Sequence, residues 1–240
     1  MRIAVLSDIH SNLVALDAVL GDAGAVDAIW HLGDVVGYGP DPDGVVARLM
    51  EIGAVGVLGN HDAAALGGPE IDWFNPDARA AALWTRATIG AAARAWLAAQ
   101  PVTAVREGVA LAHGSPRDPL REYITSRDVA RQNLTAFEER LGLHGHTHVP
   151  IAFVEDGGAV TSWSPADAGR LALEGRRALL NPGSVGQPRD GDPRAAYAVL
   201  DDTLDVMTWH RVGYDIGSVQ AAMRAAGLPA RLADRLQHGM

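Results

Sequence analysis

The sequence predicts an α/β fold with a mainly parallel or mixed sheet. Short apolar runs alternate with amphipathic segments in the first half of the chain, which favours alternating strands and helices. The second half carries paired strand-like runs around turns rich in Gly or Asp. Two sheets packed on each other and flanked by helices is the simplest architecture for both halves. The 240 residues fit one domain of ordinary to large size or two small ones, and we expect a single domain over residues 1–240.

The first half is expected to follow a strand–helix–strand–helix–strand order. Three short apolar runs predict strands at residues 2–7, 26–32 and 54–58. Two amphipathic segments between them predict helices at residues 12–23 and 41–53, the second with an acidic start and a Gly stop. The Ala-rich stretch from Ala78 to Ala99 is also expected to be helical, because Leu and Trp side chains supply apolar anchors.

The second half is expected to consist of hairpins and a helical tail. Residues 102–114 predict two short strands joined by a turn at Glu107 and Gly108. Three further hairpins are expected at residues 151–163, 170–183 and 195–210. The tail from Ser218 to Leu236 predicts one or two helices.

Composition excludes several classes of function. The net charge is −9, which argues against stable nucleic-acid binding, since a general binder needs a basic face to replace counterions. The chain has no cysteine, so disulfides, thiolate zinc sites and cysteine nucleophiles are excluded. No apolar run approaches the roughly 18 residues that span a bilayer, and the N-terminal run is too short for a signal peptide. We therefore expect no membrane partner and a cytoplasmic location.

Five predicted strands end in Asp, Asn or His, usually with a Gly beside it. Ligands of open α/β sheets bind beyond the carboxyl ends of the strands, so we expect these side chains to converge. The convergent residues are Asp8, His10, Asp34, Asn60, His113, His146 and His148. This set of nitrogen and oxygen donors is too large for one four-coordinate zinc and suits two metals with a bridging carboxylate. Imidazole with carboxylate favours manganese, iron, cobalt, nickel or zinc over calcium.

Each of these residues also has a structural explanation when it is taken alone. Asp8 and Asp34 could cap the helices that follow them, and Gly59-Asn60 could form only a turn. The run LHGHTHVP at residues 143–150 could be structural, a proton relay or a metal site. The ordered occurrence of all the motifs favours the metal site over the separate structural explanations.

The motifs together resemble those of the calcineurin-like metallophosphoesterases. Asp-x-His, Gly-Asp, Gly-Asn-His-Asp, His-Gly and Gly-His-Thr-His occur in that order over residues 8–148. The stretch NPGSVGQPRDGDPRAAYAVLD from Asn181 is similar to the small bacterial and archaeal phosphodiesterase branch, so the resemblance covers most of the chain. It implies a four-layer αββα sandwich with mixed β-sheets and with metals at the strand ends.

The resemblance also implies roles for individual residues. One of two divalent transition-metal ions would be held by Asp8, His10, Asp34 and His148. The other would be held by Asp34, Asn60, His113 and His146. Manganese is the first candidate, with iron, nickel, cobalt or zinc as alternatives. His61 would be catalytic, stabilising phosphoryl oxygens or protonating the leaving group while a metal-bound hydroxide attacks, and His144 is expected to be structural or to support a ligand.

Two departures from the family pattern bear on the substrate. The Arg-Gly that follows Gly-Asp in protein phosphatases and in symmetrical diadenosine tetraphosphatases is missing after Asp34. Gly37 stands where the protein phosphatases carry an acidic partner for the catalytic histidine. We therefore expect hydrolysis of phosphodiester or nucleotide-type phosphoanhydride bonds. The alternatives are a phosphomonoesterase, a diadenosine-tetraphosphate-type hydrolase, and a catalytically silent scaffold of the same fold.

The substrate is expected to be a small phosphorylated molecule, with nucleotides included. Arg117, Arg189 and Tyr38 are the candidates for substrate contact, because Arg binds phosphate in a bidentate manner and an aromatic ring can stack on a base. Further loop residues of the same types are Arg121, Arg194, Trp73, Phe74 and Tyr123, and the two apolar residues Trp73 and Phe74 are also compatible with a homo-oligomer interface. The remaining histidines are expected to be structural: His31, His210 and His238.

Overall fold

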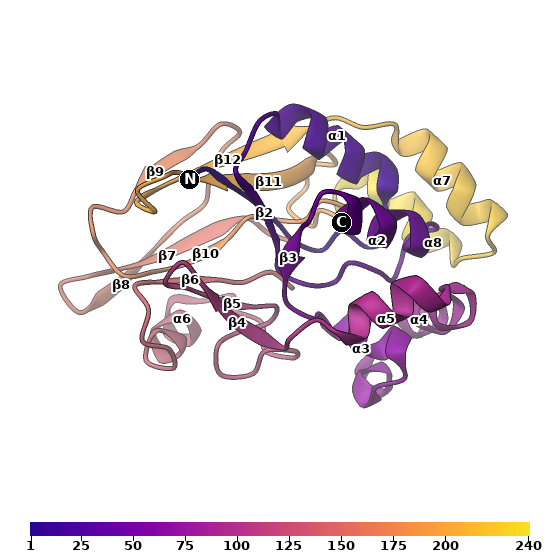
Figure 1. Cartoon of the computed structure of the whole chain (residues 1–240), viewed down its shortest axis with the longest axis horizontal. Helices are drawn as coiled ribbons and strands as arrows, with labels where there is room; N and C mark the ends of the chain where they lie inside the picture. The colour runs from indigo at the N-terminus through magenta and orange to yellow at the C-terminus, as the bar shows by residue number, and fades with distance from the viewer.

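Two six-stranded mixed sheets face each other in the computed structural model, which describes all residues from 1 to 240 (Figure 1). Sheet A has the order β3-β2-β1-β11-β12-β9. Its strands are β1 (Ile3–Leu6), β2 (Ala28–His31), β3 (Val55–Gly56), β9 (Arg170–Ala172), β11 (Ala195–Leu200) and β12 (Val206–Val212). Sheet B has the order β4-β5-β6-β10-β7-β8. Its strands are β4 (Thr103–Arg106), β5 (Val109–Ala112), β6 (Leu141–Leu143), β7 (Ile151–Asp156), β8 (Ala159–Trp163) and β10 (Ala178–Asn181).

Alternation along the strands separates the core into layers. In β1, Ile3 and Val5 are buried between the two sheets, whereas Leu6 packs beneath the helices that cover sheet A. In β10, Leu180 lies between the sheets and Leu179 packs under the helix on the other side. Successive side chains of a strand point to opposite faces, so each central strand supplies two cores.

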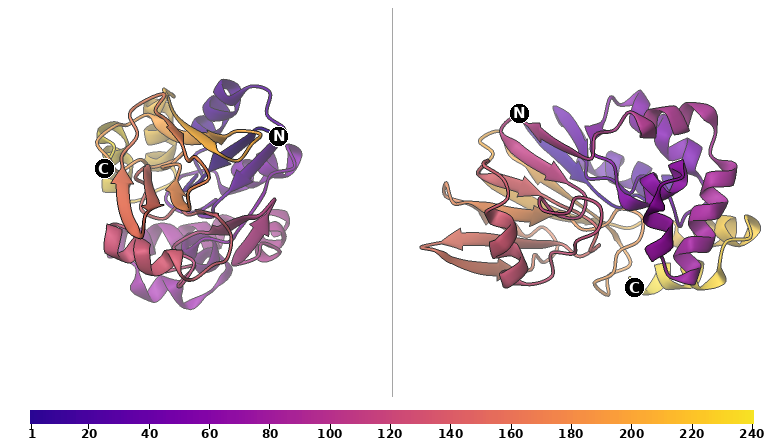
Figure 2. Two further views of the ribbon diagram at one scale, coloured as in Figure 1. Left: turned by 90° about the vertical axis from the view of Figure 1, so that its left-hand side faces the viewer. Right: turned by 90° about the horizontal axis from the view of Figure 1, so that it is seen from below.

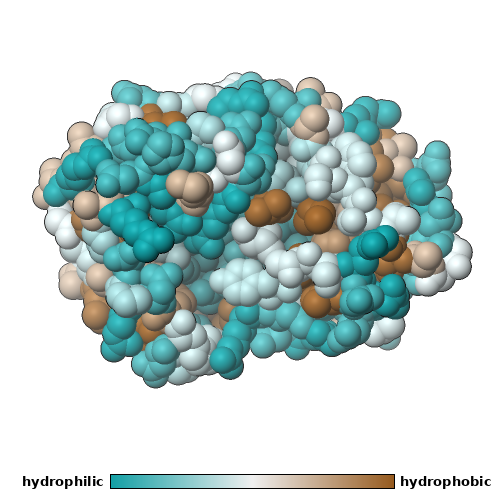
Figure 3. Space-filling view, turned by 180° about the vertical axis from the view of Figure 1, so that it is seen from behind, coloured by the Kyte–Doolittle hydropathy of each residue, from teal (hydrophilic) through white to brown (hydrophobic).

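Helices cover the outer face of each sheet and complete the four layers that the resemblance implied (Figure 2). Sheet A packs against α1 (Leu13–Ala23), α2 (Pro42–Glu51) and α5 (Ala91–Ala98), and sheet B packs against α6 (Arg127–Leu134). The other helical elements are α3 (Asn60–Leu66), η1 (Pro69–Trp73), α4 (Pro76–Thr88), α7 (Ile216–Ala225), α8 (Ala230–Asp234) and η2 (Arg235–His238). On the face opposite to Figure 1, apolar atoms form small separate groups among hydrophilic ones (Figure 3). None of the helices combines the length and apolar composition that crossing a membrane requires.

The helix caps show whether Asp8 and Asp34 cap the helices that follow them, as their structural explanation required. Asn12 caps α1 by accepting a hydrogen bond from the amide of Ala15 at 3.1 Å. Asp41 caps α2 by accepting one from the amide of Gly44 at 2.9 Å. Asp8 and Asp34 therefore do not cap these helices and are left for another role. Asn60 is the first residue of α3 rather than part of a simple turn.

Two predicted elements differ from the structure. The expected helix from Ala78 to Ala99 is two helices, because the chain breaks at Gly90, whose amide donates to the Asp43 carboxylate at 2.9 Å. The expected hairpin at residues 170–183 is wrong, since β9 pairs with β12 in sheet A while β10 lies in sheet B. Leu173 is fully buried between the sheets, and this burial directs the chain from one sheet into the other.

The other predicted strand pairs are confirmed. The pairs β4 with β5, β7 with β8 and β11 with β12 are antiparallel neighbours. The helices α3 and α6 were not predicted. Both are short, and α6 has the low mean hydropathy of a segment with five charged or amide side chains among its eight residues, so periodicity alone gave little signal.

Candidate metal centre

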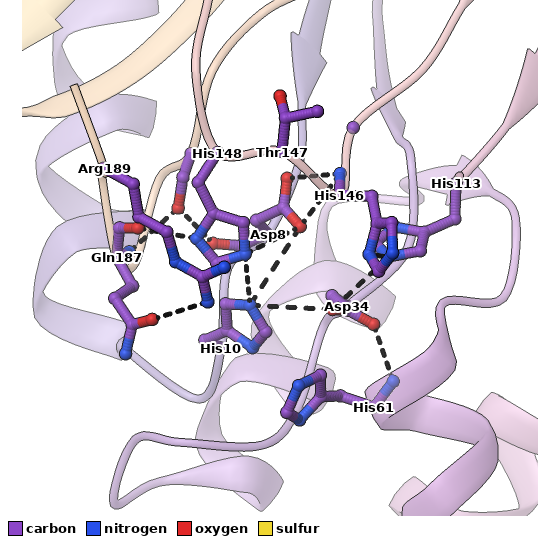
Figure 4. A network of polar contacts seen from close by, with 12 residues as sticks. Asp8, His10, Asp34, His61, His113, His146, Thr147, His148, Gln187 and Arg189 are labelled. Atoms are coloured by element: carbon purple, nitrogen blue, oxygen red, sulfur yellow. Dashed lines mark hydrogen bonds and ion pairs between the residues drawn. The ribbon is translucent and has the colours of Figure 1, made fainter. Parts of the chain in front are cut away.

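Five strands bring seven buried polar side chains to one edge of the two sheets (Figure 4). Asp8 and His10 follow β1, Asp34 follows β2, and Asn60 follows β3. His113 follows β5, while His146 and His148 follow β6. Because β1, β2 and β3 are parallel, and β5 and β6 are parallel, their carboxyl ends meet at common edges. All seven side chains are at most 6% exposed.

These residues form two groups that share one carboxylate. Asp8, His10, Asp34 and His148 make one group, and Asp34, His113 and His146 make the other, each with its donor atoms within 4.8 Å of one another. One oxygen of Asp34 lies 3.6 Å from Nε2 of His10 and 3.3 Å from Nε2 of His113. Asn60 joins the second group, since its Oδ1 lies 2.9 Å from Nε2 of His113. A carboxylate between two sets of imidazoles is the arrangement that a two-metal site needs.

The hydrogen bonds of the histidines show that the donor set fits metal cations. Nδ1 of His10 lies 3.2 Å from the carbonyl of Val36, and Nδ1 of His148 lies 2.6 Å from the carbonyl of Gln187. A carbonyl can only accept, so both Nδ1 atoms carry the proton and both Nε2 atoms present lone pairs in neutral rings. These Nε2 atoms lie only 3.1 Å apart. Two facing lone pairs repel each other, and a cation bound by both removes the repulsion.

Electrostatics of the metal-free centre is consistent with the same conclusion. Burial opposes protonation of His113, but the Asp34 and Asp8 carboxylates outweigh it and raise the pKa of His113 to about 9. Burial raises the pKa of Asp8 to about 7, with the neighbouring Asp34 carboxylate adding to the rise. Without metals the centre therefore holds protons at positions where a divalent cation would supply the positive charge.

Backbone strain is concentrated at this centre. Asp8, His10, Asp34, His146 and His148 have φ between 49° and 65°, although none of them is glycine. For a residue with a side chain, this left-handed conformation costs roughly 1 kcal/mol or more of conformational free energy. Such strain persists only where surrounding interactions over-determine the backbone, and it is typical of functional sites.

The loop after β10 forms hydrogen bonds with the residues of the candidate metal centre. The hydroxyl of Ser184 donates to the carbonyl of Asp8 at 2.8 Å, and the amide of Gly186 donates to the same carbonyl at 2.9 Å. The Gln187 carbonyl that accepts from His148 belongs to this loop as well. The loop lies within the stretch from Asn181 that entered the sequence resemblance, and its role is to fix the strained turn that carries Asp8.

His61 lies beside the ligand groups without belonging to either of them. Its amide donates to Asp34 at 2.8 Å, and its ring stacks on Phe74 with 4.3 Å between centroids. Burial lowers the pKa of His61 to about 4, and its Nδ1 has no hydrogen-bond partner. A Cβ atom at Gly37 would lie 2.6 Å from that Nδ1, so no acidic side chain fits where the protein phosphatases carry one.

A cavity of about 870 Å³ opens over the centre. Tyr38 and Arg189, two of the predicted substrate contacts, line it together with His61. Arg189 is held by Oε1 of Gln187 at 2.9 Å and by the hydroxyl of Tyr38 at 3.4 Å. The structure does not bring Arg117, the third predicted contact, into the cavity.

Local partners explain where the loop residues lie. Arg117 forms an ion pair with Glu122 and a hydrogen bond with Gln132, which hold it on the surface. Arg194 pairs with Asp192 and Asp167 and does not line the cavity. Sequence reasoning did not consider these acidic and amide partners.

Unlike Arg117 and Arg194, the aromatic residues considered for base stacking or for an interface lie at the cavity. Phe74 packs on His61, and Trp73 is covered by the guanidinium of Arg121 at 4.1 Å. Tyr123 stacks on the ring of His146 with 3.8 Å between centroids. Trp73 and Tyr123 remain 48% and 49% exposed, which leaves both rings accessible to a ligand at the cavity mouth.

Sequence reasoning missed one wall of the cavity. The lining residues that it did not consider include Arg231, Arg235 and Met240, and His238, which it took as structural, also lines the cavity. The remaining histidines agree with a structural role: His31 packs against Trp96, His210 stacks on Tyr197, and His144 is fully buried.

Comparisons with known proteins agree with this geometry. Residues 1–203 match the family model described as the calcineurin-like phosphoesterase superfamily domain. A crystal structure of a metallophosphoesterase from Sphaerobacter thermophilus is 45% identical, covers 100% of this chain and 99% of its own, and superposes with a TM-score of 0.92. An uncharacterized protein of Methanocaldococcus jannaschii is 35% identical over 98% of this chain and 96% of its own length. Phosphodiesterase YfcE of Escherichia coli is 28% identical over 86% of this chain and 91% of its own length.

Proposed function

The chain belongs to the calcineurin-like phosphoesterase superfamily, and from that premise we propose that it is a dinuclear metal-dependent phosphoesterase of phosphodiesters or nucleotide-type phosphoanhydrides. The observation that carries the proposal is the Asp34 carboxylate shared by two buried ligand groups. Phosphodiesterase YfcE, to which the chain is similar, supports the diester class by its name.

The two ligand groups support one place for each metal. One ion would be held by Asp8, His10, Asp34 and His148, and the other would be held by Asp34, Asn60, His113 and His146. When bound, the pair of ions supplies Lewis acidity toward phosphoryl oxygens and lowers the pKa of water. We propose manganese as the native ion, because these imidazole and carboxylate donors suit it.

The protein's own groups orient the substrate and manage its charge. Arg189 faces the cavity from the same loop that fixes His148, so its guanidinium binds a non-bridging phosphoryl oxygen. His61, adjacent to Asp34 and unpaired at Nδ1, contacts the phosphoryl group or the leaving oxygen. Burial outweighs the effect of the Asp34 carboxylate and lowers the pKa of His61 to about 4, which favours substrates whose leaving group needs little protonation, such as activated esters and phosphoanhydrides.

Initial rates with manganese test the proposal directly. A small aryl phosphodiester, an aryl phosphomonoester and diadenosine tetraphosphate are compared on one batch of enzyme. We expect the diester or the dinucleotide to be hydrolysed with a kcat/KM at least about tenfold above that of the monoester. A preference for the monoester would replace the proposal with a phosphomonoesterase. Bound metals without turnover of any of the three would favour a silent scaffold.

A further inference from the structure

We propose that Arg231 and Arg235 form a second phosphate subsite in the cavity, which binds a phosphoryl group other than the one that is cleaved. The substrates it selects carry two or more phosphoryl groups, as phosphoanhydrides do. This inference rests on the proposed function, because it names the substrate class of the same cavity. Arg231 lies in α8 and Arg235 in η2, outside every motif that defines the candidate metal centre.

The size of the cavity leaves room for more than one phosphoryl group. Its volume of about 870 Å³ lies in the range of pockets for drug-sized molecules, which is roughly 300–1,000 Å³. The candidate metal centre occupies one part of the lining, with Asp34, Asn60 and His146. The C-terminal residues line another part, with Arg231, Arg235 and His238.

The charges of this lining are suited to an anion. Arg189, Arg231 and Arg235 line one cavity, and none of them forms an ion pair with an Asp or Glu side chain. Three Asp carboxylates also line the cavity: Asp34 belongs to the candidate metal centre, Asp234 is engaged by Arg224 at 2.6 Å, and Asp77 lies near enough to Arg235 to raise its pKa. Arg231 has no protein partner, and Arg235 donates to the protein only through its Nε, so both guanidinium groups keep nitrogens free to bind phosphate.

The three guanidinium groups are close enough to affect one another. Burial lowers the pKa of Arg235 to about 10, and the positive charges of Arg189 and Arg231 contribute to the decrease. The mutual repulsion of these positive charges is reduced when an anion binds between them. A phosphoryl group between them relieves this repulsion.

The C-terminal turn that carries Arg235 is fixed in place. The Arg235 side chain donates to the backbone carbonyl of Met240, and the carbonyl of Gly239 accepts from the amide of Gly191 at 2.9 Å. Gly239 has φ of 62°, and a Cβ atom there would lie 2.6 Å from the backbone of Asp192. The C-terminus therefore lies against the loop that bears Arg189 (Figure 2, right). A preformed wall loses less conformational entropy when it binds a ligand.

Arg231 gives the cleaner test of the two arginines. It is exposed, and the structure records no hydrogen bond or ion pair for its side chain, so its replacement leaves the packing of α8 intact. Leu232 and Leu236, not the arginines, anchor this region in the apolar cluster that includes Tyr38. Arg106 is the matched control, since it is an exposed arginine without a side-chain hydrogen bond or ion pair and does not line the cavity.

The experiment compares the affinity of manganese-loaded protein for AMP and for α,β-methylene-ADP, a non-hydrolysable molecule with one more phosphoryl group. Isothermal calorimetry is run at a fixed excess of free manganese, so that chelation by the ligand is constant. We expect the wild type to bind the methylene diphosphate about tenfold more tightly, the effect of about one charge-assisted hydrogen bond. Arg231→Gln should reduce this preference to about threefold or less, and Arg231→Gln with Arg235→Gln should abolish it.

Three outcomes decide between the explanations. Retention of the preference in Arg106→Gln, with its loss in Arg231→Gln, supports the subsite. Equal binding of the two ligands by the wild type, or an unchanged preference in Arg231→Gln, overturns it. Turnover of a small aryl phosphodiester is measured on the same samples. If the diester is not turned over but the binding preference for the methylene diphosphate is present, the proposed activity is rejected and the subsite is supported. If the diester is turned over but the binding preference is absent, the subsite is rejected and the proposed activity is supported.

Discussion

The two sides of the cavity are built in opposite ways. On the ligand side, seven polar side chains are almost completely buried, and five of them have left-handed backbones. On the opposite side, Trp73, Tyr123 and Arg231 are exposed and have few fixed partners. The ligand side fixes the metal-ligating side chains close to one another. The opposite side presents exposed side chains whose conformations can still change when a ligand binds.

This difference suggests that the buried ligand side determines whether the reaction occurs and that the exposed side determines which substrate is used. A buried ligand can hardly be replaced, because removing one partner leaves other buried polar atoms uncompensated. An exposed arginine or aromatic residue at the cavity mouth can be replaced with little structural cost. We therefore expect substitutions on the ligand side to abolish activity and substitutions on the opposite side to change which substrate is used.

The largest effect is expected for Asp34→Asn. An amide cannot bridge two cations as a carboxylate does, so the variant should lose at least one metal and decrease kcat by about 10³-fold or more. Metal content by elemental analysis and turnover of an aryl phosphodiester measure both effects. Asp72→Asn is the control, because Asp72 is 71% exposed and pairs weakly with Arg79 at 3.5 Å. Full activity with two metals in Asp34→Asn would contradict the shared-carboxylate site.

The effect of metal removal on the thermal stability of the protein also tests the ligand side of the cavity. Chelation should lower the Tm by about 10 °C, since a ligand bound only by the folded state at 1,000 times its Kd adds about 4 kcal/mol to the free energy of unfolding. In the metal-free protein, the pKa of His113 is raised to about 9 by Asp34 and Asp8 against the effect of burial. A raised histidine pKa stabilises the fold fully below pH 6.5, and this contribution is lost as pH rises toward 9. The Tm of the metal-free protein should therefore fall between pH 7 and 9.

The metal-loaded protein should not show that decrease, because metal binding requires His113 to be unprotonated. Scanning calorimetry of both forms at several pH values measures the difference. A metal-free protein whose Tm stays constant from pH 7 to 9 would mean that His113 carries no extra proton there.

A smaller effect is expected for Arg189, which lies between the two sides. Arg189→Gln should decrease kcat/KM about 10- to 100-fold, the effect of losing one charge-assisted hydrogen bond to phosphate, while both metals stay bound. Steady-state kinetics and metal analysis check this pair of results. Loss of metal in the variant would show that Arg189 acts through the His148 loop and not on the substrate.

The smallest effect is expected for Arg117. Arg117→Gln removes a surface ion pair with Glu122, and surface ion pairs contribute about 0–1 kcal/mol to stability. We expect kcat/KM to change by no more than about twofold. A tenfold decrease would show that this loop, which also carries Tyr123, reorganises toward the substrate.

The ligand side was accessible to sequence reasoning because its information is local. Each ligand follows a short apolar strand directly, so the strand and the ligand are predicted from the same stretch, as with β1, Asp8 and His10. Parallel pairing then brings the strand ends together without further specification. His61 follows Asn60 in the chain, but its catalytic role was expected from the family resemblance and not from this logic.

The opposite side could not be predicted in this way. Arg231 reaches the cavity because Leu232 and Leu236 pack with Tyr38, a contact between residues almost 200 positions apart that no local pattern encodes. The failed hairpin at residues 170–183 has a similar cause. Which sheet a strand joins depends on the burial of Leu173 between the two sheets, and not on the turn that precedes β10.

The hydrogen bond from the His146 amide to the Asp8 carboxylate joins residues 138 positions apart. Loop-closure entropy makes such a contact unfavourable until both sheets have formed and docked. The first metal group needs the same two chain segments, through Asp8 and His148. In the proposed metalloenzyme, the cation could thus bind tightly only after the two sheets have docked. Metal uptake would then be a late step of folding, and it would distinguish finished molecules from partly folded chains.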